Sequence, residues 1–179
     1  MAITFGSVHL VRLNELLLDI DAKNESLLTE ISFEMEATAV DIVRVAKQKA
    51  SYYSDLGVLM RGITYKKVSS FNFLIISAAQ YSAFAEFGTS GTSGTSVVVP
   101  QGFEDVANEF KNVSINTGGL TLAKAIEQWG ERKGLERGDI HGVYLKILHK
   151  GRNPYPFLIP AFLDETRKLE QRLRTLLSK

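Results

Sequence analysis

Apolar residues recur every three or four positions over residues 25–51, which is the spacing of one face of an α-helix. Glutamates come early and lysines late in the same segment, an order that suits the helix dipole. We therefore predict a long amphipathic helix with this apolar face: Leu28, Ile31, Met35, Ala39, Ile42, Ala46 and Ala50. A shorter stripe predicts a preceding helix that starts after Ser7: Leu10, Leu13, Leu17 and Ile20.

A second long amphipathic pattern lies at the other end of the chain, where prolines at 154, 156 and 160 are followed by a spaced apolar stripe. Pro160 is compatible only with the first turn of a helix, because proline lacks the amide that later turns require. The sequence therefore predicts a C-terminal helix over residues 160–177. Its apolar positions are Phe162, Leu169, Leu173 and Leu176.

Strand patterns follow the stretch "SDLGVLMRGI", where Gly57 and Gly62 disfavour a helix interior. The next stretch, "ITYKKVSSFNFLIISA", is rich in β-branched and aromatic residues and predicts two strands that separate near "VSS". The second strand is apolar on both faces, which is typical of a central strand in a covered sheet. "SVVVP" predicts a third strand that ends at Pro100.

Helical spacing returns between residues 103 and 150. The patterns predict a short helix from Phe103, a helix from Thr121 that closes at Gly130 or Gly134, and a helix capped by Asp139. For the last of these, "YLKIL" also fits a strand. We expect one α+β domain over residues 1–179, with a small antiparallel sheet of about three or four strands packed against the long N-terminal and the C-terminal helices. Residues 103–150 form a helical insertion in it.

Composition excludes several classes of function. The 21 Lys and Arg residues against 20 Asp and Glu give a net charge of +1, so no global field attracts nucleic acid or an anionic membrane. The chain has no cysteine, which excludes disulfides and thiolate chemistry. With no signal-peptide pattern and no apolar run long enough for a membrane span, we expect a soluble protein, intracellular at synthesis, with no membrane partner.

Candidate chemistry is equally sparse. "GTSGTSGTS" lacks the lysine and the following helix of a phosphate-binding loop, so we predict a flexible loop over residues 88–97. His9, His141 and His149 are too widely separated to hold one metal ion, and no serine lies in a nucleophile motif. We therefore expect no enzyme, no cofactor and no metal.

Three sequence pieces, in this order, resemble motifs of the bacteriophage tail-completion protein family. "SDLGVLMRGI" is similar to the family's Asp-Thr-Gly-x-Leu-x-x-Ser-Ile turn after a long helix. "YSAFAEFGTS" is similar to its Tyr-Ala-x-x-x-Glu-Phe-Gly-Thr element, and "PFLIPAF" to the Pro-Phe-Leu-x-Pro-Ala motif that opens the last helix. The resemblance spans roughly residues 10–179.

The resemblance implies a structural virion protein, made in the bacterial host cytoplasm, that completes the tail or neck of a long-tailed phage. Copies form a ring, expected to be sixfold, at the head-proximal end of the tail and join tail to head. Its partners are other copies of itself, the tail terminator and major tail protein, and the head-completion, connector or portal proteins. DNA passes through such a ring without specific recognition. The alternatives are a tail terminator or head-closure protein, or a small nucleotide-binding or hydrolytic module that uses the glycine-rich loop.

Structural roles in assembly are assigned to the motif residues through the resemblance: Asp55, Gly57, Tyr81, Glu86, Phe87, Gly88, Thr89, Pro156, Phe157 and Pro160. Glycine at 57 permits a tight reversal after the helix. The two prolines fix the approach to the last helix. Because subunit contacts need an exposed apolar surface, Trp129 and Tyr144 of the insertion are the candidate interface residues, although aromatic residues at such spacing more often lie in a core.

Overall fold

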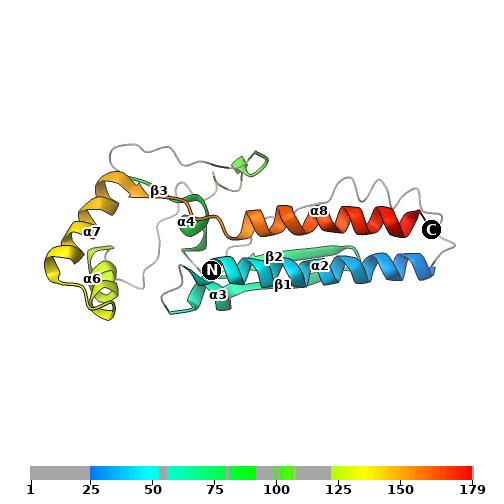
Figure 1. Ribbon diagram of the computed structural model, residues 1–179, viewed down its shortest axis with the longest axis horizontal. Coiled ribbons are helices and arrows are strands. Elements are labelled where there is room, and N and C mark those ends of the chain that lie inside the picture. The colour runs from blue at the N-terminus through cyan, green and yellow to red at the C-terminus, as the bar shows by residue number, and fades with distance from the viewer. Residues whose placement is uncertain are drawn as a thin grey trace. The chain divides into compact units, whose positions relative to one another are not determined.

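The computed structural model describes residues 25–52, 56–79, 81–91, 99, 101–105, 107 and 122–178 (Figure 1). The chain divides into two compact units. The first comprises Met1–Ala79 with Phe157–Lys179, and the second comprises Gln80–Pro156. The second unit contains the helical insertion predicted at 103–150 and begins earlier, because the chain from Gln80 onward associates with it.

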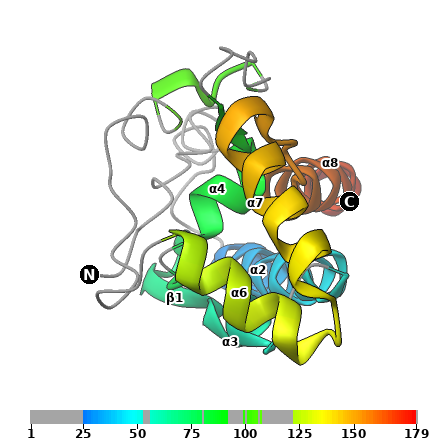
Figure 2. The same ribbon diagram turned by 90° about the vertical axis from the view of Figure 1, so that its left-hand side faces the viewer.

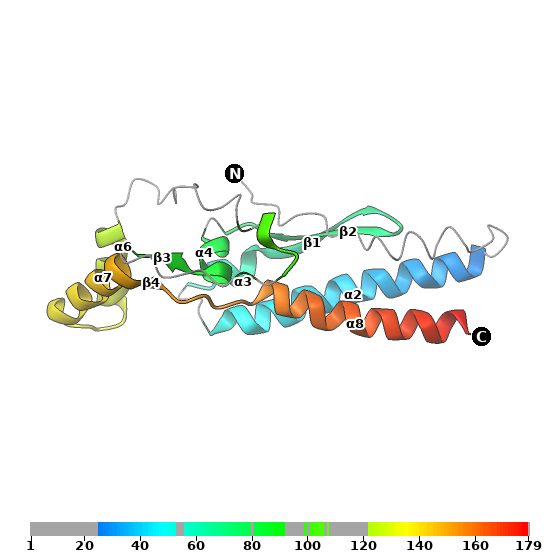
Figure 3. The ribbon, with the colours of Figure 1, turned by 90° about the horizontal axis from the view of Figure 1, so that it is seen from above.

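Two long antiparallel helices form the frame of the first unit, α2 (Glu25–Ser51) and α8 (Leu158–Leu177), which lie side by side in Figures 1 and 3. Both confirm the sequence prediction, and α8 begins two residues earlier than predicted. Their predicted apolar faces meet in a core of Ile31, Met35, Leu169 and Leu173. Burying four such side chains contributes about 1.5–3 kcal/mol each, so this seam is a main source of the unit's stability.

A β-hairpin packs against α2 in the first unit (Figure 3). After the short helix α3 (Val58–Gly62), strand β1 (Ile63–Ser69) pairs antiparallel with β2 (Asn72–Ser77), as predicted. At the hairpin end, Phe71 and Phe73 pack on the core between the two long helices. The hairpin is thus held by the same core as the helices.

The expectation that β2 is a central strand of a covered sheet is wrong for the described part of the chain. There, β2 pairs with β1 alone, and its residues from Asn72 to Ile76 are half-buried. In place of the expected sheet of three or four strands, the described residues form two separate two-stranded sheets. An apolar run indicates that its side chains are covered, but it does not indicate how many strands flank it. A strand of a hairpin that packs on a helix therefore has the same apolar pattern as a central strand of a covered sheet.

The second unit contains a helical hairpin, α6 (Leu122–Arg132) and α7 (Arg137–Lys150), seen in Figure 2. Of the two predicted closing residues, Gly134 ends α6, whereas Gly130 lies inside the helix, where a Cβ would collide with Ile140. The helical interpretation of "YLKIL" is confirmed. The predicted cap is wrong: Glu136 is the N-cap residue, and Asp139 lies in the first turn, where its charge still suits the helix dipole.

A short helix and a pair of very short strands, none of them predicted, complete the described part of the second unit. Helix α4 (Ser82–Phe87) leads to β3 (Thr89–Ser90), which pairs antiparallel with β4 (Gly151–Arg152). The first Thr-Ser pair of the predicted flexible loop 88–97 is therefore in a strand, because its backbone hydrogen-bonds to β4.

Several predictions fall on residues outside the described ranges. They are the helix after Ser7, the position of Asp55, residues 92–97 of the predicted loop, and most of "SVVVP", of which Val99 is described and is not in a strand. Of the predicted helix from Phe103, Glu104, Asp105 and Ala107 are described and are helical.

Candidate functional site

The first motif forms the turn between α2 and the hairpin. Gly57 has φ 69°, a left-handed conformation that glycine adopts without strain, as expected for a reversal. The side chain of Arg61 donates a hydrogen bond from Nη2 to the backbone oxygen of Leu56 over 2.8 Å and so closes the turn. Leu59 and Ile63 are fully buried. They are the anchors of this motif, and the sequence analysis missed them although they coincide with its Leu and Ile positions.

The second motif forms the buried helix α4 in the second unit. The Glu86 side chain is only 2% exposed and Phe87 is also buried, whereas Tyr81 is half-buried at the N-cap. The backbone amide of Tyr155 donates a hydrogen bond to the carbonyl oxygen of Ala85 over 2.8 Å. This hydrogen bond ties the second motif to the chain that leads into the third.

Gly88 ends α4 in a conformation that only glycine tolerates, with φ 77° and ψ −171°. A Cβ at this position would lie 2.5 Å from the backbone oxygen of Arg152 and 2.8 Å from the nitrogen of Pro154. Beside it, the backbone amide of Arg152 donates a hydrogen bond to Thr89 Oγ1 over 3.0 Å. The Gly-Thr pair of the motif therefore allows two backbone segments to approach closely.

The third motif begins α8. Phe157, at the N-cap, is fully buried, and Pro160 is half-buried in the first turn, as the sequence predicts. Pro156 is exposed just before it. The described residues of all three motifs thus make turns, helix ends and core anchors. They bind the fold together and do not converge on a reactive centre.

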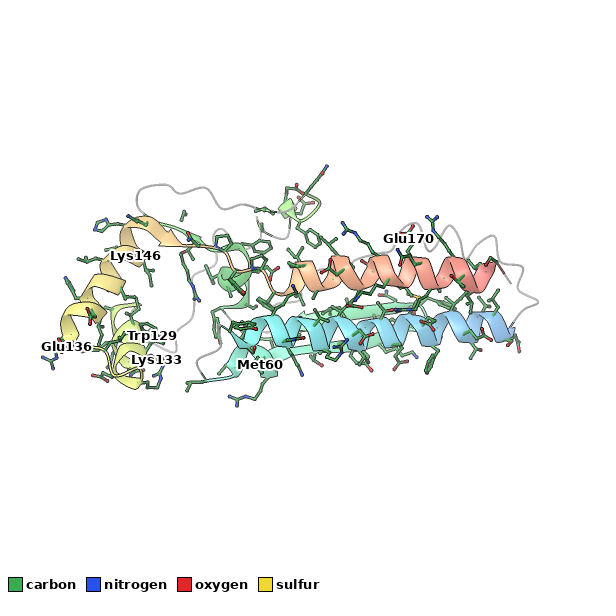
Figure 4. All side chains as sticks on the ribbon, in the orientation of Figure 1. Met60, Trp129, Lys133, Glu136, Lys146 and Glu170 are labelled. Carbon is green, nitrogen blue, oxygen red and sulfur yellow. The ribbon has the colours of Figure 1, made fainter. Side chains whose placement is uncertain are left out.

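The two candidate interface residues of the second unit are only half-buried. Trp129 lies on α6 (Figure 4). Tyr144 lies on α7 with its ring centre 6.3 Å from that of His141. Neither belongs to the most exposed apolar residues of the described chain. Those include Phe33, 72% exposed, and Val40, 46% exposed, both on α2. The sequence analysis missed them. The available signal was an apolar residue off the buried stripe of an amphipathic helix.

Charged groups of the first unit pair across its elements. Glu36 accepts a hydrogen bond from Lys67 Nζ over 2.7 Å, and this contact lowers the pKa of the Glu36 carboxyl against the opposing effect of desolvation. A hydrogen bond from Tyr65 adds to the lowering. Arg172 Nε lies 2.8 Å from Glu34 Oε2, close enough for ionic attraction although not aligned as a hydrogen bond. These pairs join α2 to the hairpin and to α8.

The described residues were compared with the patterns of metal sites and membrane spans. They contain no group of three or more His, Asp or Glu residues that could hold a metal ion. None of the described helices combines the length and the apolar composition that crossing a bilayer requires. Comparison of this chain with protein-family models, with curated proteins and with solved structures found no match to any of them.

Proposed function

We propose that the chain is a structural virion protein that completes the tail or neck of a long-tailed phage. Copies of it form a ring at the head-proximal end of the tail and join tail to head, without catalysis. The proposal starts from the three motifs that resemble the tail-completion family. It is supported by the structural nature of their described residues, which are buried anchors and turn glycines.

The observation that carries the proposal is the exposed apolar surface on α2. Phe33 and Val40 lie seven residues apart, two turns along the helix, and are 72% and 46% exposed. Covering a large apolar side chain stabilises a protein by about 1.5–3 kcal/mol, so such residues on one helix face favour association. A subunit of an assembly needs a surface of this kind, whereas a monomer with a catalytic pocket does not.

Negative-stain electron microscopy of the purified full-length chain tests the proposal. The chain is imaged alone and after mixing with the tail and head proteins encoded beside it. We expect closed rings in at least one of the two samples, with the ring seated at the end of tail tubes when these are present. Isolated monomers in both samples would contradict the proposal.

Tail completion is separated from tail termination and head closure by the partner that the ring binds. A tail-completion ring binds the tail end and the head connector, and we expect both to be retained by the immobilised chain. Retention of the head connector alone would favour head closure, and retention of the major tail protein alone would favour a terminator.

A further inference from the structure

The open face of α2 consists of Phe33, Ala37 and Val40, which are spaced by four and three residues and so lie on one side of the helix. Neighbouring positions engage the other elements of the unit: Glu36 contacts the hairpin, and Thr38 accepts a hydrogen bond from Arg172 of α8 over 2.7 Å. Ala37 is half-buried, and the other two residues are exposed. The open face is therefore the side of α2 turned away from both the hairpin and α8.

The exposed face of α7 consists of Gly142, Leu145 and Leu148, which are spaced by three residues. Both leucines are 37% exposed. A Cβ added at Gly142 would meet no atom of the described residues within 4 Å, so no close contact among them accounts for glycine at this helix-interior position. Glycine is unfavourable there, and it leaves room beside the two leucines for a large side chain from another molecule.

Opposite charges surround the two faces. Residues 25–40 contain no lysine or arginine and four glutamates. Of these, Glu34 and Glu36 pair with Arg172 and Lys67 of the same unit, whereas Glu25 and Glu30 are exposed. Residues 137–152 contain four basic residues, Arg137, Lys146, Lys150 and Arg152, and a single acid, Asp139. The net charge of +1 for the whole chain conceals this separation. Complementary potentials of this kind orient protein partners and exclude like-charged pairings.

We propose that the open face of α2 in one copy docks on the exposed face of α7 in the next copy, with Phe33 seated over Gly142 and beside Leu145. The inference rests on the proposed ring function and names the contact that builds the ring. Because the two faces differ, each copy uses one face toward each neighbour. Such a head-to-tail contact generates a ring when the rotation closes.

A symmetric contact between two copies of α2 is the less favourable pairing. It would bring the exposed Glu25 and Glu30 of both copies to one interface, and like charges across an interface cost stability. The contact between α2 and α7 brings the same glutamates toward basic residues and covers apolar residues of both helices. Charge and apolar exposure thus favour the same pairing.

The test uses two single variants of the full chain, Phe33→Asp on the open face of α2 and Leu145→Asp on the exposed face of α7. Each variant keeps one functional face, so each is expected to be monomeric alone. An equimolar mixture is expected to give a dimer and nothing larger, because one intact α2 face meets one intact α7 face. Sedimentation velocity measures these masses, and circular dichroism confirms that both variants are folded. Leu163→Asp on α8, an equally exposed leucine outside both faces, is the matched control and should assemble as the unmodified chain does.

The milder variants Phe33→Ala and Leu145→Ala keep the test decisive if an aspartate variant does not fold. Each truncates a proposed central contact, and we expect each to weaken association by about 30-fold, the effect of a typical interface hot spot.

The outcomes separate this inference from the proposed function. Rings formed by either aspartate variant would overturn the contact and leave the ring function standing. Loss of assembly in Phe33→Asp but not in Leu145→Asp would indicate a symmetric α2 contact instead. A mixture that stays monomeric, while the unmodified chain forms rings, would also overturn the pairing. If the unmodified chain does not associate under any condition, both proposals fail.

Discussion

Gly88→Ala is expected to destabilise the second unit by more than an ordinary glycine substitution. The backbone at Gly88, with φ 77° and ψ −171°, lies in a region that other residues occupy at a cost of about 1–3 kcal/mol. The added methyl would also lie 2.5 Å and 2.8 Å from backbone atoms of Arg152 and Pro154, and these cannot rotate away as a side chain would. The steric overlap costs a further ~1–3 kcal/mol, so we expect the free energy of unfolding to fall by roughly 2–6 kcal/mol in total.

The control is Gly134→Ala in the same unit. Gly134 has φ 69°, but a Cβ there would meet nothing within 4 Å, so only the conformational cost remains, about 1 kcal/mol. Trp129 is the single tryptophan of the chain and lies in this unit, so its fluorescence follows the unfolding of the unit in urea. The free energy of unfolding falls by about 2 kcal/mol for each 1 M of urea, so Gly88→Ala should lower the urea midpoint of the unmodified chain by at least about 1 M. Equal midpoints for the two variants would refute the steric argument.

Three further predictions concern the first unit. Glu36→Gln removes a carboxylate whose pKa is lowered by Lys67. The carboxylate stabilises the folded state above pH 4.5, and this stabilisation is lost as the pH falls through the lower folded-state pKa. The thermal unfolding temperature of the variant should therefore depend less on pH in the acid range than that of the unmodified chain. Ser77→Ala removes a buried hydroxyl that has no hydrogen-bond partner in the described structure, so it should raise the free energy of unfolding by about 1 kcal/mol, and a loss would indicate a hidden partner. Leu169→Ala should cost about 2–5 kcal/mol by circular dichroism at 222 nm, and the exposed Leu163→Ala less than about 1 kcal/mol.

Most of the secondary structure of the described chain was predictable because its signals are local. The stripes from Ile31 to Ala50 and from Leu169 to Leu176 give both long helices, and the turn near Ser69 gives the hairpin. What failed depends on contacts distant in sequence. The pairing of Thr89 with Arg152 has no local signature, and the apolar faces of β2 do not show that a helix, rather than further strands, covers it.

Exposed apolar surface is harder to predict from sequence, for a related reason. Spacing identifies which residues share a helix face but not which face remains open after packing. Trp129 and Tyr144 were the natural candidates because large aromatic residues dominate interfaces, yet both are half-buried. Phe33 and Val40 lie off the apolar stripe in the sequence, but their exposure follows from the packing of the hairpin and α8 against other sides of α2.

The proposed position in the neck is tested most directly by locating the chain on phage virions released from cells that produce it. Gold-labelled antibodies raised against the full chain are applied to intact particles and to separated tails, and both are imaged by electron microscopy. We expect gold at the junction of head and tail, and at the head-proximal end of separated tails. Particles and tails without label, from cells in which the chain is abundant, would contradict a structural role in the neck.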